Sequence, residues 1–421
     1  MVKRVPSAKL LVLLAALLTA AGGCELRSDS KPPAPEPGSD GTSQGHAAGG
    51  DASEVSLKQL VDSMSLEEKI GQMVVAGMNG TSAGTDIRRL IAQRHVGGVI
   101  LYENNVGSVS TTTALSNELK AANAAAKLPL LLSADQEGGR VSRLPKELAA
   151  FPSARDVGSS GDEQYAYAIG AATGRTMKAV GWNTAYAPVL DIHTNPSNPV
   201  IGPRAFGTTA DTVSRIGLQE LQGLRSEGVI GVVKHFPGHG DTSVDSHKGL
   251  PVVEHDIERL RKVEFVPFAA AIRQGVQAVM VGHLLMKKLD AGAPASMSKQ
   301  LITGYLRGEL QFEGVVITDD MTMAAVRNTA ELGAAAVRSV NAGADIVLVG
   351  HQTRNVDTVL DALVEAARAG TISSEAVDRS VYRIAKLKAD AKLNDAATRA
   401  ADPAMLNKEI RNAVSQIKTK K

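Results

Sequence analysis

VIGVVKHFPGHGDTSVDSH, residues 229–247, joins a run of apolar residues directly to a segment crowded with ionisable side chains. The run over 229–233 has the composition of a strand that is buried on both faces. The segment over 234–247 holds three histidines, two aspartates and a lysine, and its glycines and proline interrupt regular structure. Burying so many ionisable groups without partners would cost on the order of several kcal/mol each. A solvated surface loop is the simplest alternative, but this density of titratable groups favours an active-site loop that follows a buried strand.

The alternation of short apolar runs with helical segments recurs along the chain. Eight runs are nearly continuous in apolar residues, as strands buried on both faces should be: 73–77, 98–101, 128–133, 184–190, 228–233, 278–281, 314–318 and 344–349. Helical segments separate them, and two further helices are expected over 356–369 and 374–393. This order predicts an α/β fold, a (β/α)8 TIM barrel in a single domain with a C-terminal helical extension. A doubly wound open sheet is the alternative.

The composition limits the function. The chain has 421 residues, 43% of them hydrophobic, which is enough for one large core or two smaller ones. Its 46 basic and 44 acidic residues create no overall field that would favour nucleic acid or a bulk membrane surface as a partner. There is no GxxxxGK[ST] and no GxGxxG between a strand and a helix, so nucleotide binding has little support and we expect no cofactor.

The N-terminus has the pattern of an export signal. Basic residues precede an apolar run over 10–21, which is too short to span a bilayer and is followed by Gly22, Gly23 and Cys24. Cys24 is the only cysteine, so no intrachain disulfide can form, and its position resembles the lipidated cysteine of a bacterial lipobox. The resemblance implies an exported protein that is lipid-anchored to the outer face of the bacterial cell membrane. We therefore expect four segments: a signal peptide (1–24), a flexible tether rich in Pro, Gly and Ser (25–55), a catalytic domain (56–395) and a helical or frayed tail (396–421).

Polar residues follow five consecutive expected strands, at the end where a barrel carries its active site. They are DQEGGRVSR (135–143) after the third strand, Asp191 and His193 with the later Arg204 after the fourth, 234–247 after the fifth, His283 after the sixth, and Asp319 with Asp320 after the seventh. Because the carboxyl ends of the strands meet at one mouth, we expect these side chains to form one site.

Two of these groups suggest a reaction. Asp319 and Asp320 are adjacent, so on a strand one carboxylate enters the mouth while the other turns away. A carboxylate fixed at the mouth suits a nucleophile or an oxocarbenium stabiliser. In extended geometry Asp245 and His247 lie on the same side, and an aspartate beside an imidazole makes a general acid/base pair. A hydrogen bond that only stabilises the loop is the alternative for Asp245 and His247. A histidine-bound metal that assists hydrolysis is a less favoured alternative, because no HxH pair is present.

Five motifs in order resemble the glycoside hydrolase family 3 β-N-acetylglucosaminidases, over about residues 57–392. They are DQEGGRVSR (135–143), APVLDI (187–192), GPRAFG (202–207), KHFPGHG followed by DSH (234–247), and ITDDM (317–321). The resemblance implies that Asp319 is the nucleophile, with His247 as the general acid/base and Asp245 as its dyad partner. It also implies that the sugar is bound by Asp135, Arg143, Arg204, Lys234 and His235.

The implied activity is removal of terminal N-acetylglucosamine from cell-wall fragments in which it is linked to N-acetylmuramic acid, or from chitin-derived oligomers. Carbohydrate is therefore the expected partner, and membrane contact is expected only through the lipid anchor. Two rivals stay open at this point. One is a phosphorylase with the same site, in which phosphate replaces water. The other is a non-catalytic lipoprotein that captures cell-wall sugars.

Overall fold

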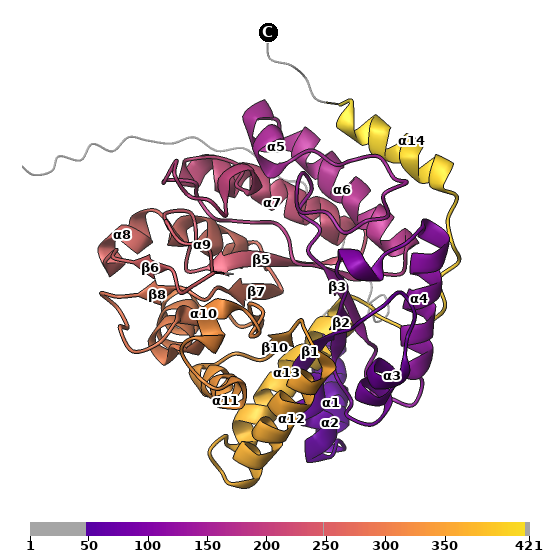
Figure 1. Ribbon diagram of the computed structural model, residues 1–421, viewed down its shortest axis with the longest axis vertical. Coiled ribbons are helices and arrows are strands. Elements are labelled where there is room, and N and C mark those ends of the chain that lie inside the picture. Colours follow the sequence, from indigo (N-terminus) through magenta and orange to yellow (C-terminus); the bar gives the residue numbers. More distant parts are fainter. Residues whose placement is uncertain (1–47, 247, 417–421) are drawn as a thin grey trace, which may run out of the picture. The chain divides into compact units, whose positions relative to one another are not determined.

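The computed structural model describes residues 48–246 and 248–416 (Figure 1). Two of the predicted functional residues, Cys24 and His247, lie outside the described residues, as do the expected signal peptide and most of the expected tether. The first described helix, α1 (Ala48–Asp62), starts inside the stretch that was expected to be tether.

Eight parallel strands form one sheet in the order β10-β1-β2-β3-β4-β5-β7-β9. The strands at the two ends of this order also meet, because Ile317 forms a parallel bridge with Ile346 and the N–H of Thr318 donates to the carbonyl of Ile346 over 3.0 Å. The sheet is therefore a nearly closed barrel, which confirms the predicted fold and excludes the open sheet. Its strands are β1 (Val74–Gly77), β2 (Gly98–Ile100), β3 (Leu131–Ala134), β4 (Thr184–Ala185), β5 (Ile230–Phe236), β7 (Ala278–Val281), β9 (Val315–Thr318) and β10 (Val347–Val349).

Each of the eight apolar runs supplies one strand, and only β7 has the predicted bounds; the carboxyl ends of β4 and β5 differ most from the prediction. β4 stops at Ala185 instead of continuing to residue 190, and Pro188 in the missing part has no N–H to donate to a ladder. β5 continues through Phe236, which pairs with Val281 of β7 beyond an irregularity in the register. Placing Lys234 and His235 at the start of a loop was therefore wrong, because both residues belong to the strand.

Helices surround the barrel, and one continuous apolar core lies between them and the strands (Figure 1). Ser65 and Glu68 form a capping box at the start of α2, since the N–H of Glu68 donates to the Ser65 hydroxyl and the N–H of Ser65 donates to the Glu68 carboxylate. The segment around Pro267 forms two separate helices, with the proline in the first turn of the second. The barrel helices are α2 (Leu66–Gln72), α3 (Thr85–Ala92), α4 (Val109–Ala122), α5 (Ala154–Ser160), α6 (Glu163–Ala179), α7 (Ala210–Ser226), α8 (Ile257–Lys262), α9 (Phe265–Arg273), a π-helix (Gln300–Glu309), α10 (Ala324–Arg327), α11 (Leu332–Ala342), α12 (Thr353–Arg368) and α13 (Ser374–Asp390).

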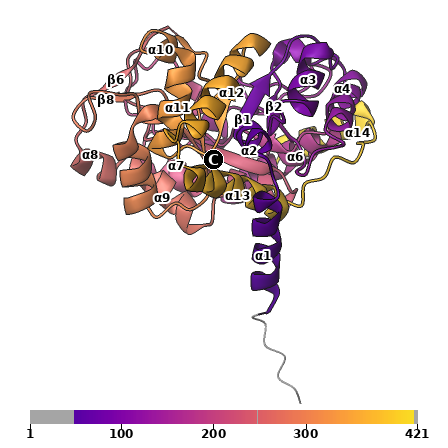
Figure 2. The same ribbon diagram turned by 90° about the horizontal axis from the view of Figure 1, so that it is seen from below.

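The remaining elements lie outside this pattern. A small parallel pair, β6 (Val252–Val253) and β8 (Leu285–Met286), ties together the segments that follow β5 and β7. The chain after α13 runs beside α4, where Asp395 accepts hydrogen bonds from Asn123 and from the N–H of Leu130. It ends in α14 (Pro403–Val414), a helix that packs on α6 (Figure 1). Figure 2 shows α1 extending away from the barrel below α2 and α13. Among the described helices, each is too short or too polar to span a lipid bilayer.

Candidate active site

Lys234 lies at the centre of an ion-pair network at the carboxyl ends of the strands. Its Nζ is 2.5 Å from Oδ1 of Asp135 and 2.7 Å from Oε1 of Glu137. Arg204 holds the same Glu137 through two hydrogen bonds of 2.7 Å each. Burial alone would raise the pKa of Glu137, but the charges of Arg204 and Lys234 lower it far below its usual range. Glu137, Arg204 and Lys234 are therefore all charged at neutral pH, and the bidentate guanidinium–carboxylate pair fixes the geometry of Arg204 and Glu137.

His235 is fixed from both sides of its ring. Its Nδ1 lies 2.7 Å from Oδ2 of Asp191, a fully buried carboxylate, and its Nε2 lies 3.4 Å from Nη2 of Arg204. The carboxylate can only accept, so Nδ1 carries the proton that it donates to Asp191. Asp191 also accepts the main-chain N–H of His239 over 2.6 Å. Asp191 was expected to be a structural residue of the site, and here it anchors two histidines.

The irregular register of β5 explains why Lys234 and His235 serve the same site. In a regular strand, neighbouring side chains point to opposite faces. The pairing of β5 with β7 shifts between Val233 and Phe236, and this breaks the alternation. Both residues can then interact with the charge of Asp319, the predicted nucleophile. Five of the predicted residues are thereby brought to one place: Asp135, Arg204, Lys234, His235 and Asp319.

Asp319 follows the last residue of β9, and its main-chain N–H donates to the carbonyl of Val281 at the end of β7. Its Oδ1 accepts the N–H of Asp320 over 2.8 Å. Burial would raise the pKa of Asp319, but His283, His235, the hydrogen bond from Asp320 and Lys234 lower it to about 2. The side chain is therefore a carboxylate at neutral pH, which suits a nucleophile and excludes a role as general acid at that pH.

The loop after β5 is held firmly at its start. Asn198 donates to the carbonyls of His239 and Gly240 over 2.9 and 3.2 Å. His239 is buried, and its Nδ1 and Nε2 lie 2.8 and 3.4 Å from the hydroxyls of Thr242 and Ser246. Burial and the charge of His235 lower the pKa of His239 to about 4, so this imidazole is neutral at pH 7. His239 thus supports the part of the loop that carries Asp245.

Asp245 lies in the same loop and its carbonyl accepts the N–H groups of Lys248 and Gly249. The main-chain carbonyl of the next residue, Ser246, accepts the N–H of Ala325 at the start of α10, a few residues after Asp319. The loop and the segment after β9 are therefore in contact. Because His247 lies outside the described residues, the predicted dyad of Asp245 and His247 stays a prediction.

Arg143, the remaining predicted residue, is bound mainly through its main chain. Its N–H donates to the side-chain oxygen of Gln136 over 2.9 Å. Its buried Nε has no hydrogen-bond partner among the described residues, and the same holds for Nε2 of Gln136. Glu137 lies in the same motif as Arg143 but was not predicted to be a site residue. The two cations that bind it, Arg204 and Lys234, come from distant parts of the chain, so no local sequence pattern reveals the contact.

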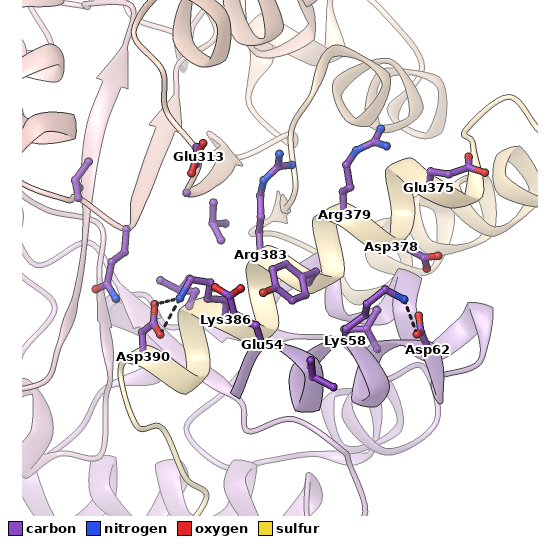
Figure 3. A pocket seen from close by; sticks show the side chains of 18 residues that line it. Glu54, Lys58, Asp62, Glu313, Glu375, Asp378, Arg379, Arg383, Lys386 and Asp390 are labelled. Atoms are coloured by element: carbon purple, nitrogen blue, oxygen red, sulfur yellow. Dashed lines mark hydrogen bonds and ion pairs between the residues drawn. The ribbon is translucent and has the colours of Figure 1, made fainter. Parts of the chain in front are cut away.

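A separate groove lies at the opposite end of the barrel. It has a volume of about 950 Å³ and lies between α1, α13 and the residues that precede β7 and β9 (Figure 3). Its charged side chains include two ion pairs between residues four apart, Lys58 with Asp62 on α1 and Lys386 with Asp390 on α13. None of the predicted site residues within 48–246 and 248–416 lines this groove, so it is distinct from the candidate active site. Within the described residues, no group of three or more His, Cys, Asp or Glu side chains is arranged to hold a metal ion.

The family model of the glycosyl hydrolase family 3 N-terminal domain matches residues 65–387, which include the whole barrel. The chain belongs to glycoside hydrolase family 3. The prediction that it is a glycoside hydrolase is confirmed at this level, and the five sequence motifs lie within the matched segment.

Individual relatives of this family 3 chain are β-hexosaminidases. Beta-hexosaminidase LpqI of Mycobacterium tuberculosis is 37% identical over 334 residues, which are 77% of this chain and 83% of that protein. Beta-hexosaminidase A of Pseudoalteromonas piscicida is 34% identical over 332 residues, but they cover only 56% of that longer protein. The structure of a family 3 β-N-acetylglucosaminidase from Paenibacillus sp. superposes with a TM-score of 0.79 and 40% identity, over 84% of this chain and 69% of that one.

Proposed function

We propose that this protein is a retaining exo-β-N-acetylglucosaminidase that cleaves terminal N-acetylglucosamine from oligosaccharides. The observation that supports the proposal most directly is the ionised carboxylate of Asp319 beside the cluster of Lys234 and His235. Relatives named β-hexosaminidase and β-N-acetylglucosaminidase support the choice of sugar.

In the proposed first step, Asp319 attacks the anomeric carbon and forms a covalent glycosyl–enzyme intermediate. The bond between the anomeric carbon and the leaving oxygen breaks, and protonated His247 donates its proton to that oxygen. In the second step, neutral His247 removes a proton from water, which attacks the anomeric carbon and releases Asp319. Two displacements leave the sugar with its original β-configuration.

A histidine is a suitable acid/base partner for this nucleophile. Asp319 is already an anion with a pKa of about 2, and a second carboxylate beside it would repel it. An imidazole is neutral or positive and titrates near neutral pH, so it can donate and accept a proton in turn. Asp245 would orient the imidazole and stabilise its charged form.

The sugar would be bound by the ion-pair network. Asp135 is the partly exposed member, with 23% of its side chain accessible, and it can accept hydrogen bonds from hydroxyl groups. Lys234, Arg204 and His235 lie behind it and are fixed by Glu137 and Asp191. Arg143 would donate hydrogen bonds from its guanidinium group, which carries N–H donors and no acceptor.

The proposed substrates are cell-wall fragments in which N-acetylglucosamine precedes N-acetylmuramic acid. The proposed location is the outer face of the bacterial cell membrane, with the protein held by lipid on Cys24. The basic and apolar residues that precede Cys24 support this location. Mass spectrometry of the mature N-terminus, compared with a Cys24→Ser variant, tests the anchor.

Activity of the purified protein on a chromogenic N-acetylglucosaminide tests the function. The wild type should release the chromophore, and Asp319→Ala should lower the rate by at least about 10,000-fold. Added phosphate should leave the rate unchanged and yield no sugar 1-phosphate. Accumulation of sugar 1-phosphate would instead identify the phosphorylase. If the wild type binds the sugar but shows no turnover, the binding lipoprotein is correct.

A further inference from the structure

Asp320, the residue after the predicted nucleophile, has a side chain that binds the turn after β9 and the segment after β10. Its Oδ1 accepts three hydrogen bonds within 3 Å, from the N–H and the hydroxyl of Thr322 and from the N–H of Gly350. Thr322 belongs to the turn that follows β9, and Gly350 follows β10. One carboxylate oxygen thus joins the ends of two neighbouring strands.

The main chain of Asp320 is held as well. Its carbonyl lies 3.0 Å from Nε2 of His283, a fully buried residue that follows β7. Because a carbonyl only accepts, the imidazole donates from Nε2, and its Nδ1 faces the hydroxyl of Ser296 at 2.7 Å. Residue 320 is therefore fixed by contacts from β7, from β10 and from its own turn.

The second oxygen of Asp320 faces the outer part of the mouth. Oδ2 lies 3.5 Å from the hydroxyl of Tyr102 and 3.7 Å from Nε2 of His351. A Cβ at position 350 would lie 2.1 Å from the Tyr102 hydroxyl and 2.4 Å from this oxygen. Only glycine at position 350 therefore leaves room for the carboxylate to reach its donors.

We propose that Asp320 is a positioning residue that fixes the nucleophile through its own main-chain N–H. That N–H donates to Oδ1 of Asp319 over 2.8 Å and is the contact between the two aspartates. The three hydrogen bonds to the Asp320 side chain set the direction of this main-chain N–H. The N–H in turn holds Oδ1 of Asp319, so that Oδ2 of Asp319 points toward the anomeric carbon. The assignment rests on the proposed function, since it needs Asp319 to be the attacking group.

The adjacent aspartates thus have different tasks. Asp319 reacts, and Asp320 does not touch the substrate. Removing the Asp320 carboxylate should keep the main-chain N–H but leave its orientation unrestrained, and Asp319 would then approach the anomeric carbon in a less favourable orientation. Misplacement of a reacting group by about 1 Å can cost about 100-fold in rate. An asparagine at position 320 keeps an oxygen for the same three donors and should largely restore the rate.

The test compares Asp320→Ala, Asp320→Asn and wild type in the rate at which a 5-fluoro-N-acetylglucosaminyl fluoride labels Asp319, followed by intact mass. Asp378→Ala, which removes a carboxylate bound to Lys69 far from the site, is the matched control. Labelling rates are normalised to the folded fraction from thermal unfolding. We expect about a 100-fold loss for Asp320→Ala. We expect less than about a tenfold loss for Asp320→Asn, and no change for Asp378→Ala.

A second readout separates positioning of the nucleophile from effects on the acid. The kcat/KM values for 4-nitrophenyl and phenyl N-acetylglucosaminides should fall by the same factor in Asp320→Ala, because both substrates need Asp319. A loss confined to the phenyl substrate, or labelling of folded Asp320→Ala within threefold of wild type, would overturn the assignment alone. A wild-type enzyme that reacts with the fluoride but is not labelled on Asp319 would overturn the proposed function together with it.

Discussion

Arg204 holds Glu137 through two hydrogen bonds of equal length, 2.7 Å each, although the two residues come from loops after different strands. The same carboxylate also binds Lys234, so one buried anion compensates two buried cations. This arrangement makes Glu137 the residue on which the sugar-binding network depends, even though it faces other protein groups and not the substrate.

Replacing Glu137 by Gln should therefore damage stability and activity together. The change leaves Arg204 buried without its anion, and removing one partner of a buried ion pair costs about 3–5 kcal/mol. Denaturant unfolding should show this loss in the free energy of unfolding, with kcat/KM reduced in the folded fraction. Glu118→Gln is the control, because its pair with Arg88 is exposed and should contribute less than about 1 kcal/mol. Equal effects of both changes would contradict the account.

His239 should act through the loop that carries Asp245. Its imidazole contacts the hydroxyls of Thr242 and Ser246 and lies edge-on to the ring of His235, so His239→Ala should act mainly by loosening the loop. The expected result is a loss of roughly tenfold in kcat for a phenyl glycoside, which needs protonation of its leaving group, and a smaller loss for a 4-nitrophenyl glycoside. A change in KM alone, with kcat preserved for both substrates, would show that His239 serves the sugar site instead.

His247→Ala should separate the two substrates most strongly. If His247 is the acid, its loss should lower kcat/KM for the phenyl glycoside by about 100-fold or more, while the 4-nitrophenyl glycoside loses far less in the first step. Steady-state rates on both glycosides measure this. Asp245→Asn should produce the same trend with a smaller effect. Equal losses for the two glycosides in His247→Ala would refute the acid role.

Lys388 makes stability depend on pH. This fully buried amine on α13 donates to the side-chain oxygen of Gln72 and the carbonyl of Gly97, and burial lowers its pKa from 10.5 to about 7. Between these values the unfolded chain holds a proton that the folded chain lacks, so the free energy of unfolding rises with pH from about 7 to 10.5. The slope contributed by Lys388 is up to about 1.4 kcal/mol per pH unit.

Urea unfolding of wild type and Lys388→Met at several pH values checks this contribution. The free energy of unfolding of the variant, minus that of wild type, should be largest at pH 7 and below and should shrink as the pH rises toward 10.5. Lys386→Met is the control, because Lys386 is partly exposed on the same helix and pairs with Asp390. A difference between Lys388→Met and wild type that does not vary with pH would contradict the buried neutral amine.

The strands could be predicted because burial on both faces leaves a continuous apolar run, and every such run became a strand of the barrel. Their ends could not, because they depend on neighbours: Pro188 cannot donate to a ladder, and Phe236 gains a partner in Val281. The site shows the same division. Asp319 and Lys234 were found because they end apolar runs, whereas Glu137 and Asp191 have roles that only the meeting of distant loops creates.

The configuration of the first sugar released tests the central claim most directly. Proton NMR during hydrolysis of a β-N-acetylglucosaminide in D₂O distinguishes the two anomers before mutarotation equilibrates them. Two displacements at Asp319 predict that β-N-acetylglucosamine appears first and the α-anomer grows in later. Initial appearance of the α-anomer would mean a single displacement by water and would contradict Asp319 as the nucleophile.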